Sequence, residues 1–347
     1  MLLALISSSA TAYGRQSPPP GTAAGAQETA QQKTPGRIVK NVTRVIVPVS
    51  VKDRAGQLVP DLRQSDFRIL EDNVEQKITD FNAEPAPLSI VVLLDNDLKS
   101  KDAEQVAASL RSILAALSLS DEVFVCRFDQ YFHQGKGFIA DQDKLWKELK
   151  RTELDTEPSV APPSPAINNG PSINGHSASG DAPNTAATTL IIKGQPTKAM
   201  DDAVYEAAQL LKDRGRDRRK IIFLISDGIN APKFNKFKYG DALKELLRND
   251  IAVFSIGVGG AYFDRKFEHL SRYAHDTGGD VFYGMKNKAL EELYSRVTEE
   301  ARNQYRLEYS PENTNNEETY HSIEVRVKRE GLSVTARQGY YSGGAAR

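Results

Sequence analysis

Strand-like alternation of apolar and polar residues occurs at both ends of this chain, with alternating strand and helix patterns between them. Every second residue is apolar over 45–51 and again over 305–309. Asp72-Asn73 predicts a tight hairpin turn that leads into a strand over 76–81. Neither end holds enough strands to bury a core alone. We therefore expect one small β-domain built from both ends, with the middle of the chain inserted into it.

The middle of the chain predicts a mostly parallel sheet with helices on both faces. The continuous apolar run Leu88–Leu94 is typical of a central strand that is covered on both sides. Further strands are expected at 122–128, 132–139, 220–226, 252–258 and 281–283, and helices at 101–117, 141–150, 199–214, 240–249, 263–276 and 288–303. Such alternation indicates an α/β fold, whose functional crevice lies at the carboxyl ends of the strands.

Two segments predict disorder rather than folded structure. Both are rich in Pro, Gly, Ala and small polar residues and hold few large apolar groups. The first forms a linker, and the second interrupts the strand–helix alternation as a long insert. The expected organisation is a linker at 13–37, a first β segment at 38–84, an α/β domain at 87–303 with the insert at 152–195, and a second β segment at 304–342.

Residues 1–12 resemble the end of a secretory signal. A short apolar run is followed by Ala10-Thr11-Ala12, a small-x-small cleavage pattern, although no positive residue precedes the run. We interpret the segment as a truncated signal peptide, with a plain disordered tail as the alternative. Since no other run is long enough to span a bilayer, we expect a protein that is secreted or held in the periplasm or cell envelope.

Composition argues against several classes of function. The formal net charge of −1 attracts neither nucleic acid nor an anionic membrane. The five histidines show no metal-ligand spacing, and the sequence holds no nucleotide-binding glycine fingerprint and no serine nucleophile elbow. The single cysteine, Cys126, lies in an apolar stretch and is expected to be a buried small hydrophobe. We therefore expect no enzyme and no nucleic-acid partner.

Two carboxylates follow predicted strands directly. Asp95 ends the apolar run VVLLD, and Asp227 follows the apolar strand at 220–226 in FLISDG. Because the carboxyl ends of parallel strands meet at one edge of a sheet, these residues are expected to share a site.

The segment DFRILEDNVEQKITDF, followed by a proline and the strand ending at Asp95, resembles the bacterial von Willebrand factor A-related domain family described in Acidobacteria. That family reads D-F-x-x-x-E-D-G-x-x-Q-x-I-x-x-F, and Asn73 here replaces the glycine, which is compatible with a left-handed turn. The ending Gly339-Tyr340-Tyr341 is similar as well, so the resemblance covers 42–342. It implies a Rossmann-like A domain inserted in an immunoglobulin-like β-domain.

The resemblance also implies a metal-ion-dependent site with two altered ligand positions. The family loop reads Asp-x-Ser-x-Ser, whereas this chain has Asp95, Asp97 and Lys99 at those positions. Asp227 matches the aspartate of the third loop. In the second loop, aligning Asp-Ala motifs puts Lys198 at the threonine position, and a shift of one residue restores Thr197. The sequence does not decide between the two registers.

Three interpretations of the site follow. In the first, Asp95, Asp97 and Asp227, with or without Thr197, hold a divalent cation such as Mg²⁺ or Mn²⁺ weakly. In the second, Lys99 or Lys198 takes the place of the cation and forms a salt bridge, because clustered buried carboxylates require a counter-charge. In the third, the carboxylates only cap helices and the site is a relic.

The functional hypothesis is a non-catalytic exported adhesion-type protein. Its protein partner is expected to dock at the strand ends around the residues named above, Asp95, Asp97, Lys99, Thr197, Lys198 and Asp227. The alternative is a structural component of a cell-envelope assembly, in which the A domain is a spacer with a metal-free relic site. A hydrolase was the third hypothesis, and it lacks candidate catalytic groups in the sequence.

Overall fold

The computed structural model describes residues 44–151, 172–173, 176–177, 197–260, 268–284, 287–311 and 318–343. The expected signal at 1–12 and linker at 13–37 lie outside these residues. The expected disordered insert at 152–195 also lies outside them, except for two short strands that pair antiparallel, β8 (Ser172–Ile173) and β9 (His176–Ser177).

A six-stranded sheet forms the centre of the α/β domain, in the order β12-β11-β10-β5-β6-β7. Its neighbouring strands are parallel except β7, which runs antiparallel to β6. The strands are β5 (Leu88–Asp95), β6 (Glu122–Phe128), β7 (Phe132–Gln134), β10 (Arg219–Ser226), β11 (Ile251–Gly257) and β12 (Val281–Tyr283). The predicted mostly parallel sheet is confirmed.

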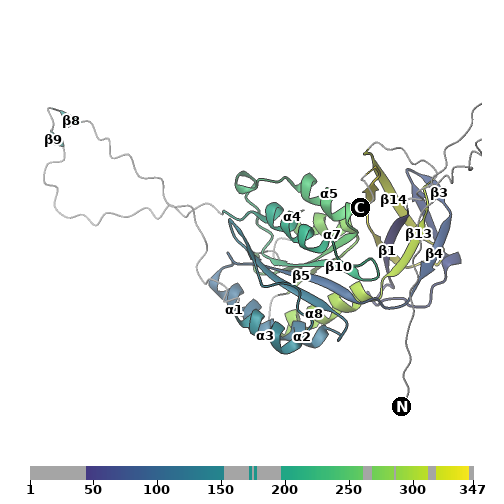
Figure 1. The fold of residues 1–347 in the computed structure, drawn as a ribbon, viewed down its shortest axis with the longest axis horizontal. Helices are drawn as coiled ribbons and strands as arrows, with labels where there is room; N and C mark the ends of the chain where they lie inside the picture. Colours follow the sequence, from purple (N-terminus) through teal and green to yellow (C-terminus); the bar gives the residue numbers. More distant parts are fainter. Residues whose placement is uncertain are drawn as a thin grey trace, which may run out of the picture. The chain divides into compact units, whose positions relative to one another are not determined.

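Helices cover both faces of this sheet, as Figure 1 shows. On one face Ile90 and Val92 of β5 pack with α1, α2, α3 and α8, and on the other Val91 and Leu93 pack with α4, α5 and α7. The helices are α1 (Ser100–Ser109), α2 (Arg111–Ala116), α3 (Gln142–Arg151), α4 (Met200–Leu211), α5 (Tyr239–Arg248), α7 (Glu268–Thr277) and α8 (Asn287–Arg302), with short 3₁₀ helices η1 (Gln64–Asp66) and η2 (Pro232–Phe234). Every residue of β5 is buried, which explains its uninterrupted apolar sequence.

The helix expected over 101–117 is divided into α1 and α2 at Leu110. The Ser109 hydroxyl donates a hydrogen bond to the Val106 carbonyl at 2.8 Å and also contacts the Tyr294 hydroxyl at 2.8 Å. A serine that bonds to a preceding carbonyl competes with the helical backbone and bends the helix. The prediction of one continuous helix was therefore wrong at this point.

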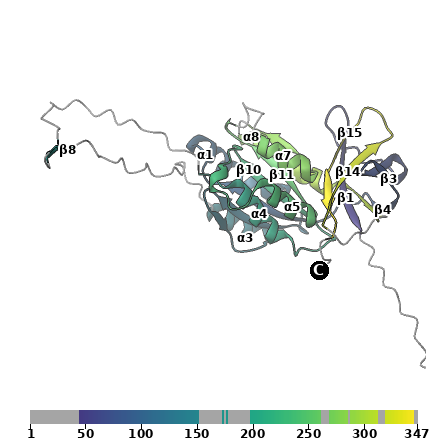
Figure 2. The ribbon, with the colours of Figure 1, turned by 90° about the horizontal axis from the view of Figure 1, so that it is seen from above.

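Both ends of the chain form a β-domain of two antiparallel four-stranded sheets, ordered β15-β1-β13-β4 and β16-β14-β2-β3 (Figures 1 and 2). The strands are β1 (Val45–Lys52), β2 (Phe67–Glu71), β3 (Val74–Gln76), β4 (Ile78–Asn82), β13 (Tyr305–Tyr309), β14 (Tyr320–Val327), β15 (Ser333–Ala336) and β16 (Gly339–Tyr341). Each sheet contains strands from both ends, and one core of alternate apolar residues joins the two sheets. Strands from the two ends of the chain therefore pair with each other in both sheets, as predicted.

The hairpin at Asp72-Asn73 forms as expected, but its second strand does not continue as predicted. Asp72 and Asn73 have φ of 48° and 66°, the left-handed values that a two-residue hairpin turn requires. The expected strand at 76–81 is interrupted at Lys77. The residues before it pair with β2, whereas those after it pair with β13 in the other sheet. A change of sheet within one strand is invisible to a simple alternation pattern.

Ionic and polar contacts connect the β-domain to the α/β domain. The Lys52 ammonium of β1 lies 2.5 Å from a Glu300 carboxylate oxygen of α8 and 2.6 Å from one of Asp280. Gln304, between α8 and β13, donates to the Ser50 hydroxyl at 3.2 Å and to the Gly278 carbonyl at 3.0 Å. These bonds fix the position of the segment that connects α8 to β13.

Cys126 is a buried residue of β6, and burial raises the pKa of its thiol to about 12. The thiol therefore stays protonated at neutral pH and behaves as a small hydrophobe. Among the residues that the structure describes, no helix is both long and apolar enough to cross a membrane.

Replacement of Leu307 tests the joining of the chain ends. This fully buried residue of β13 pairs with Val47 of β1 and Phe81 of β4. Leu307→Ala is expected to lower the free energy of unfolding by about 2–5 kcal/mol, because it removes buried methyl groups and leaves a cavity. In urea titrations, the exposed control Val74→Ala should change it by less than about 0.5 kcal/mol. Equal effects of the two variants would contradict the packing.

Candidate functional site

The carboxyl ends of β5 and β10 bring Asp95 and Asp227 to the same edge of the sheet. The two strands are parallel neighbours in a register that pairs Leu94 with Ile225. The chain therefore places the two carboxylates side by side, as expected for adjacent parallel strands.

The Lys198 ammonium lies between these two carboxylates. Its Nζ is 2.9 Å from Oδ2 of Asp95 and 2.8 Å from Oδ1 of Asp227. The side chains of Lys198 and Asp95 are 2% and 0% exposed, and that of Asp227 is 10% exposed, so the pairs form almost without water. We call these three residues the lysine–aspartate cluster.

Backbone bonds hold Lys198 in this position just before α4. The Lys198 carbonyl accepts a hydrogen bond from Ala231 N at 2.8 Å, in the loop after β10. The next residue, Ala199, donates its N–H to the Asp129 carbonyl at 2.8 Å, in the loop after β6. The second loop is therefore tied to the ends of two strands, which fixes which of its side chains points inward.

The first and third loops orient the carboxylates through local bonds. Asp95 Oδ2 accepts a 2.6 Å bond from the Ser226 hydroxyl, and Asp95 Oδ1 accepts the backbone N–H of Asp97 at 2.9 Å. Asp227 Oδ1 accepts the N–H of Ile229 at 3.0 Å. Such bonds leave the oxygens that face Lys198 little freedom to move.

Burial and charge act on Lys198 and Asp227 in opposite ways. Burial favours the neutral form of Lys198, but Asp95 and Asp227 outweigh it and raise the pKa of the ammonium. Burial and the Asp95 charge together raise the pKa of Asp227, despite the neighbouring lysine. The raised pKa of Lys198 stabilises the folded state below the unfolded value of 10.5, and this contribution is lost as pH rises through the folded pKa. The raised pKa of Asp227 has the opposite effect, because it lowers the stability of the folded state at pH values above the unfolded pKa of 3.8. At neutral pH the lysine stays charged.

The residues do not fit a divalent ion at this position. The carboxylate oxygens that would face a cation are the ones that face Lys198 Nζ, and an ammonium offers no lone pair. An ion could enter only by displacing the Lys198 ammonium, and backbone hydrogen bonds of Lys198 and Ala199 hold this part of the chain in place. The cluster therefore supplies its own positive charge.

The other predicted site residues lie around this cluster in different environments. Thr197 and Asp97 are buried next to Lys198 and Asp95 in the chain. Lys99 is exposed and precedes α1, where its carbonyl accepts the N–H groups of Asp102 and Ala103 at 2.8 and 2.9 Å. The hypothesis that Lys99 fills the cation position does not match its place in the structure, since Lys198 makes that ion pair.

Sequence reasoning missed a buried polar network behind the cluster. Asp201 of α4 accepts the Tyr273 hydroxyl at 2.7 Å and the Asn230 amide at 2.8 Å. Asn230 in turn accepts the backbone N–H of Met200 at 3.2 Å. These contacts connect α4 and α7 to the third loop. The one usable signal in the sequence was Asn230, a lone amide in the otherwise non-polar run from Gly228 to Pro232.

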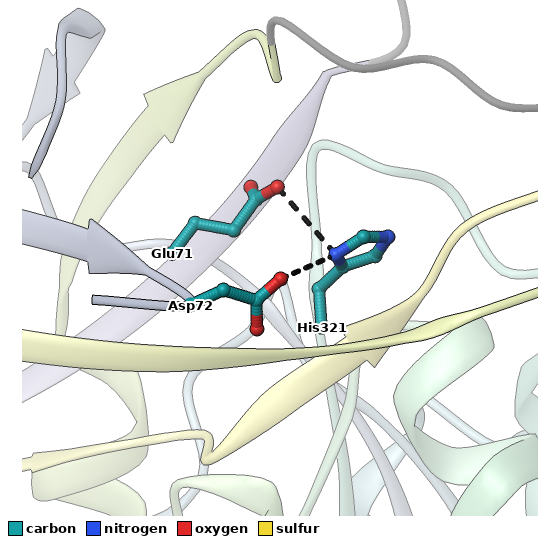
Figure 3. Close-up of side chains that lie close together, drawn as sticks. All are labelled: Glu71, Asp72 and His321. Atoms are coloured by element: carbon teal, nitrogen blue, oxygen red, sulfur yellow. Dashed lines mark hydrogen bonds and ion pairs between the residues drawn. The ribbon is translucent and has the colours of Figure 1, made fainter. Parts of the chain in front are cut away.

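A second group of carboxylates surrounds His321 in the β-domain, far in sequence from the predicted site (Figure 3). In the described part of the chain, Glu71, Asp72 and His321 each bring one metal-ligating atom within 4.8 Å of the others. Nδ1 of His321 is 2.7 Å from an Asp72 carboxylate oxygen and 3.7 Å from one of Glu71. A hydrogen bond from His321 lowers the pKa of Asp72, so this carboxyl is ionised at neutral pH.

The bonding of His321 indicates a structural contact here. Its Nε2 lies 3.2 Å from the Ser342 hydroxyl, which itself donates to the Thr319 carbonyl at 3.2 Å. Nδ1 of the ring donates to Asp72, because an ionised carboxylate can only accept. Nδ1 then has no lone pair for a metal, and the contact ties β14 to the β2–β3 turn.

Replacing Lys198 by methionine tests the lysine–aspartate cluster. Lys198→Met leaves buried carboxylates without their counter-charge, so it is expected to lower the free energy of unfolding at pH 7 by about 3–5 kcal/mol. The loss should shrink as pH falls, because the folded variant takes up protons on the carboxylates more readily than the unfolded chain does. Urea titrations at pH 7 and pH 5 measure both effects.

A matched variant separates charge from shape in this test. Lys198→Met combined with Asp95→Asn and Asp227→Asn should recover most of the loss, since no unpaired charge remains. An equal loss in the single and the triple variant would contradict the electrostatic account.

Comparison with known proteins identifies the α/β domain. The family model of the von Willebrand factor type A domain matches residues 172–296, a segment that holds Lys198 and Asp227, whereas Asp95 precedes it. No curated protein matches the chain.

Solved structures with similar folds share little sequence with this chain. BatB from Bacteroides thetaiotaomicron is 14% identical, with 62% of this chain and 98% of that chain covered at a TM-score of 0.43. Manganese-loaded TRAP from Plasmodium vivax is 12% identical, with 79% and 98% covered at 0.41. A von Willebrand factor type A protein from Catenulispora acidiphila is 10% identical, with 87% and 74% covered at 0.43. The similarity to the von Willebrand factor type A domain family is therefore shown for residues 172–296, which include strands β10 and β11 of the parallel sheet described above.

Proposed function

We propose that this chain is a non-catalytic, exported binding protein whose A domain docks a protein partner at the strand-end edge without a bound metal ion. The observation that carries the proposal is the Lys198 ammonium between Asp95 and Asp227, at distances of 2.9 and 2.8 Å. The strand-end edge is where α/β folds assemble binding sites. Here that edge keeps a preformed charged cluster in which a side chain replaces the cation.

The charge of the cluster determines what the partner presents. Two buried carboxylates, Asp95 and Asp227, contact one ammonium and leave the cluster with a formal charge of −1. An acidic partner side chain would meet uncompensated negative charge, whereas a basic one would be attracted. The resemblance implies an acidic partner residue that completes a metal shell, and the altered residues favour the opposite sign.

Exposed residues around the cluster offer the contact area. The exposed Lys99 lies in the loop between β5 and α1, and Tyr131 follows β6 with 66% of its surface exposed. The Asp129 carboxylate accepts the Tyr131 N–H at 2.8 Å, and the Asp129 carbonyl bonds Ala199 beside Lys198. Exposed aromatic residues are enriched in protein interfaces. Tyr131 is therefore the best residue with which to probe this face.

Partner recovery from an envelope extract tests the docking face. With the purified chain as bait, Tyr131→Ala is expected to lower the yield of the specifically recovered protein severalfold, because it removes an aromatic contact at the strand ends. Leu119→Ala is the matched control, since Leu119 is 90% exposed in the loop before β6, at the opposite edge of the sheet. Equal yields from wild type and both variants would favour the alternative role of a structural spacer.

A hydroxyl at position 198 tests the metal-free character of the site. Lys198→Thr removes the ammonium and supplies an oxygen ligand, so calorimetry should show Mg²⁺ or Mn²⁺ heat for this variant and none for the wild type. Adding Asp227→Asn to the variant should abolish that heat. Saturable heat in the wild type that Asp227→Asn removes would overturn the metal-free proposal.

A further inference from the structure

A cavity lies at the junction of the two domains, at the edge of the central sheet opposite the lysine–aspartate cluster. Its volume is about 170 Å³. The α/β domain contributes Pro87 before β5 and the first residues of β10 and β11, and the β-domain contributes residues of β1 and β13. A cavity of roughly 150 Å³ holds a molecule the size of benzene, so this one can hold a small ligand.

Positive charge is in excess on the cavity wall. The wall carries six basic side chains and three acidic ones. The basic residues are Arg216, Arg218, Arg219, Lys220, Arg306 and Arg337. Of the acidic residues, Asp250 pairs with Arg337 at 2.7 Å, whereas the other two, Glu84 and Asp217, are exposed to solvent.

Two of these cations, the half-buried Arg219 and the buried Lys220, lack a carboxylate at ion-pair distance among the described residues. Within the described ranges, no carboxylate oxygen lies within 4.0 Å of the charged nitrogens of Arg219 or Lys220. Lys220 is 7% exposed, and the Arg219 guanidinium donates to the backbone carbonyl of Gln304. Buried charges are costly unless they are paired. This cost indicates that a mobile counter-charge belongs in the cavity.

Unused hydrogen-bond donors are present on the same wall. The buried Nε atoms of Arg219, Arg306 and Arg337 have no acceptor among the described residues. Nε and a terminal nitrogen of a guanidinium form the fork that binds two oxygens of one anion. The cavity wall therefore carries the guanidinium groups that are suited to bind an oxyanion.

Burial also alters the ionisation of these two side chains. Burial, reinforced by the nearby Arg306 charge, lowers the pKa of Arg219 to about 10. Burial likewise lowers the pKa of Lys220. With a pKa of about 10, Arg219 remains positive at neutral pH, and a bound anion would offset the cost of burying these side chains.

We propose that this cavity binds a small oxyanion with two or more negative charges, of the phosphate or sulfate class. Arg219 and Lys220 at the start of β10 supply the unpaired charge, and Arg306 of β13 adds a donor from the other domain. Because the ligand is held from both domains, its binding fastens the β-domain to the α/β domain. This site is independent of the strand-end docking face.

Calorimetry of the full chain with inorganic phosphate at constant ionic strength tests this site. Wild type should bind one phosphate saturably, with a rise in the thermal midpoint that chloride does not reproduce. Arg219→Gln should weaken phosphate binding by about tenfold or more, the effect of losing one charge-assisted hydrogen bond of about 1.4 kcal/mol or more. Arg326→Gln is the matched control, because Arg326 is exposed and paired with Glu324.

A second variant guards against loss of folding. Lys220→Met removes an unpaired buried charge, so it should weaken phosphate binding while leaving the thermal midpoint in phosphate-free buffer equal to or above that of the wild type. Parallel titrations with sulfate and phosphoserine distinguish a free ion from a phosphorylated ligand. Absence of saturable binding for all three, or equal weakening by Arg219→Gln and Arg326→Gln, would overturn the proposal.

Discussion

The pairing of β1 with β13 is the contact on which the rest of the fold depends. β13 leaves the last helix of the α/β domain and runs between β1 and β4, so one strand from the end of the chain joins two from its beginning. Without it, only the sheet that pairs β14 with β2 would join the two ends, and the core between the two sheets would lose one side. Lys52 of β1 also forms an ion pair with Glu300 of α8, so β1 connects the β-domain to the α/β domain. The two ends of the chain therefore pair with each other and also contact the domain that carries the central sheet.

Charge is compensated differently in three parts of the molecule. At the strand ends, Lys198 lies between two aspartates, and in the β-domain His321 donates to a carboxylate. In both places a donor on the chain faces the carboxylate. At the domain junction the imbalance is reversed, since the half-buried Arg219 and the buried Lys220 have no carboxylate at ion-pair distance among the described residues. The first two arrangements are complete as they stand, and the third is complete only with a ligand.

The sequence predicted most of the fold because its periodicities report burial directly. Leu88–Leu94 reads as a central strand since every position is covered, and Val45 to Val51 alternate because one face is buried. Asp95 and Asp227 were expected to meet because parallel strands end at one edge. What could not be predicted depends on contacts between distant segments. The choice of Lys198 over Thr197 is made by bonds from Ala231 and Ala199 to other loops, and the approach of His321 to Asp72 depends on the register between β14 and the hairpin.

A lysine that replaces a metal ion differs from that ion in one further way. A bound cation has a dissociation constant, and a surface that depends on it changes with the supply of the metal and with competing chelators. The Lys198 ammonium is part of the chain and cannot diffuse away, and it remains charged at neutral pH. A docking face built on it is therefore always assembled once the protein has folded. Under the proposed function, such a face loses the option of control by metal concentration and gains independence from the metal content of its surroundings.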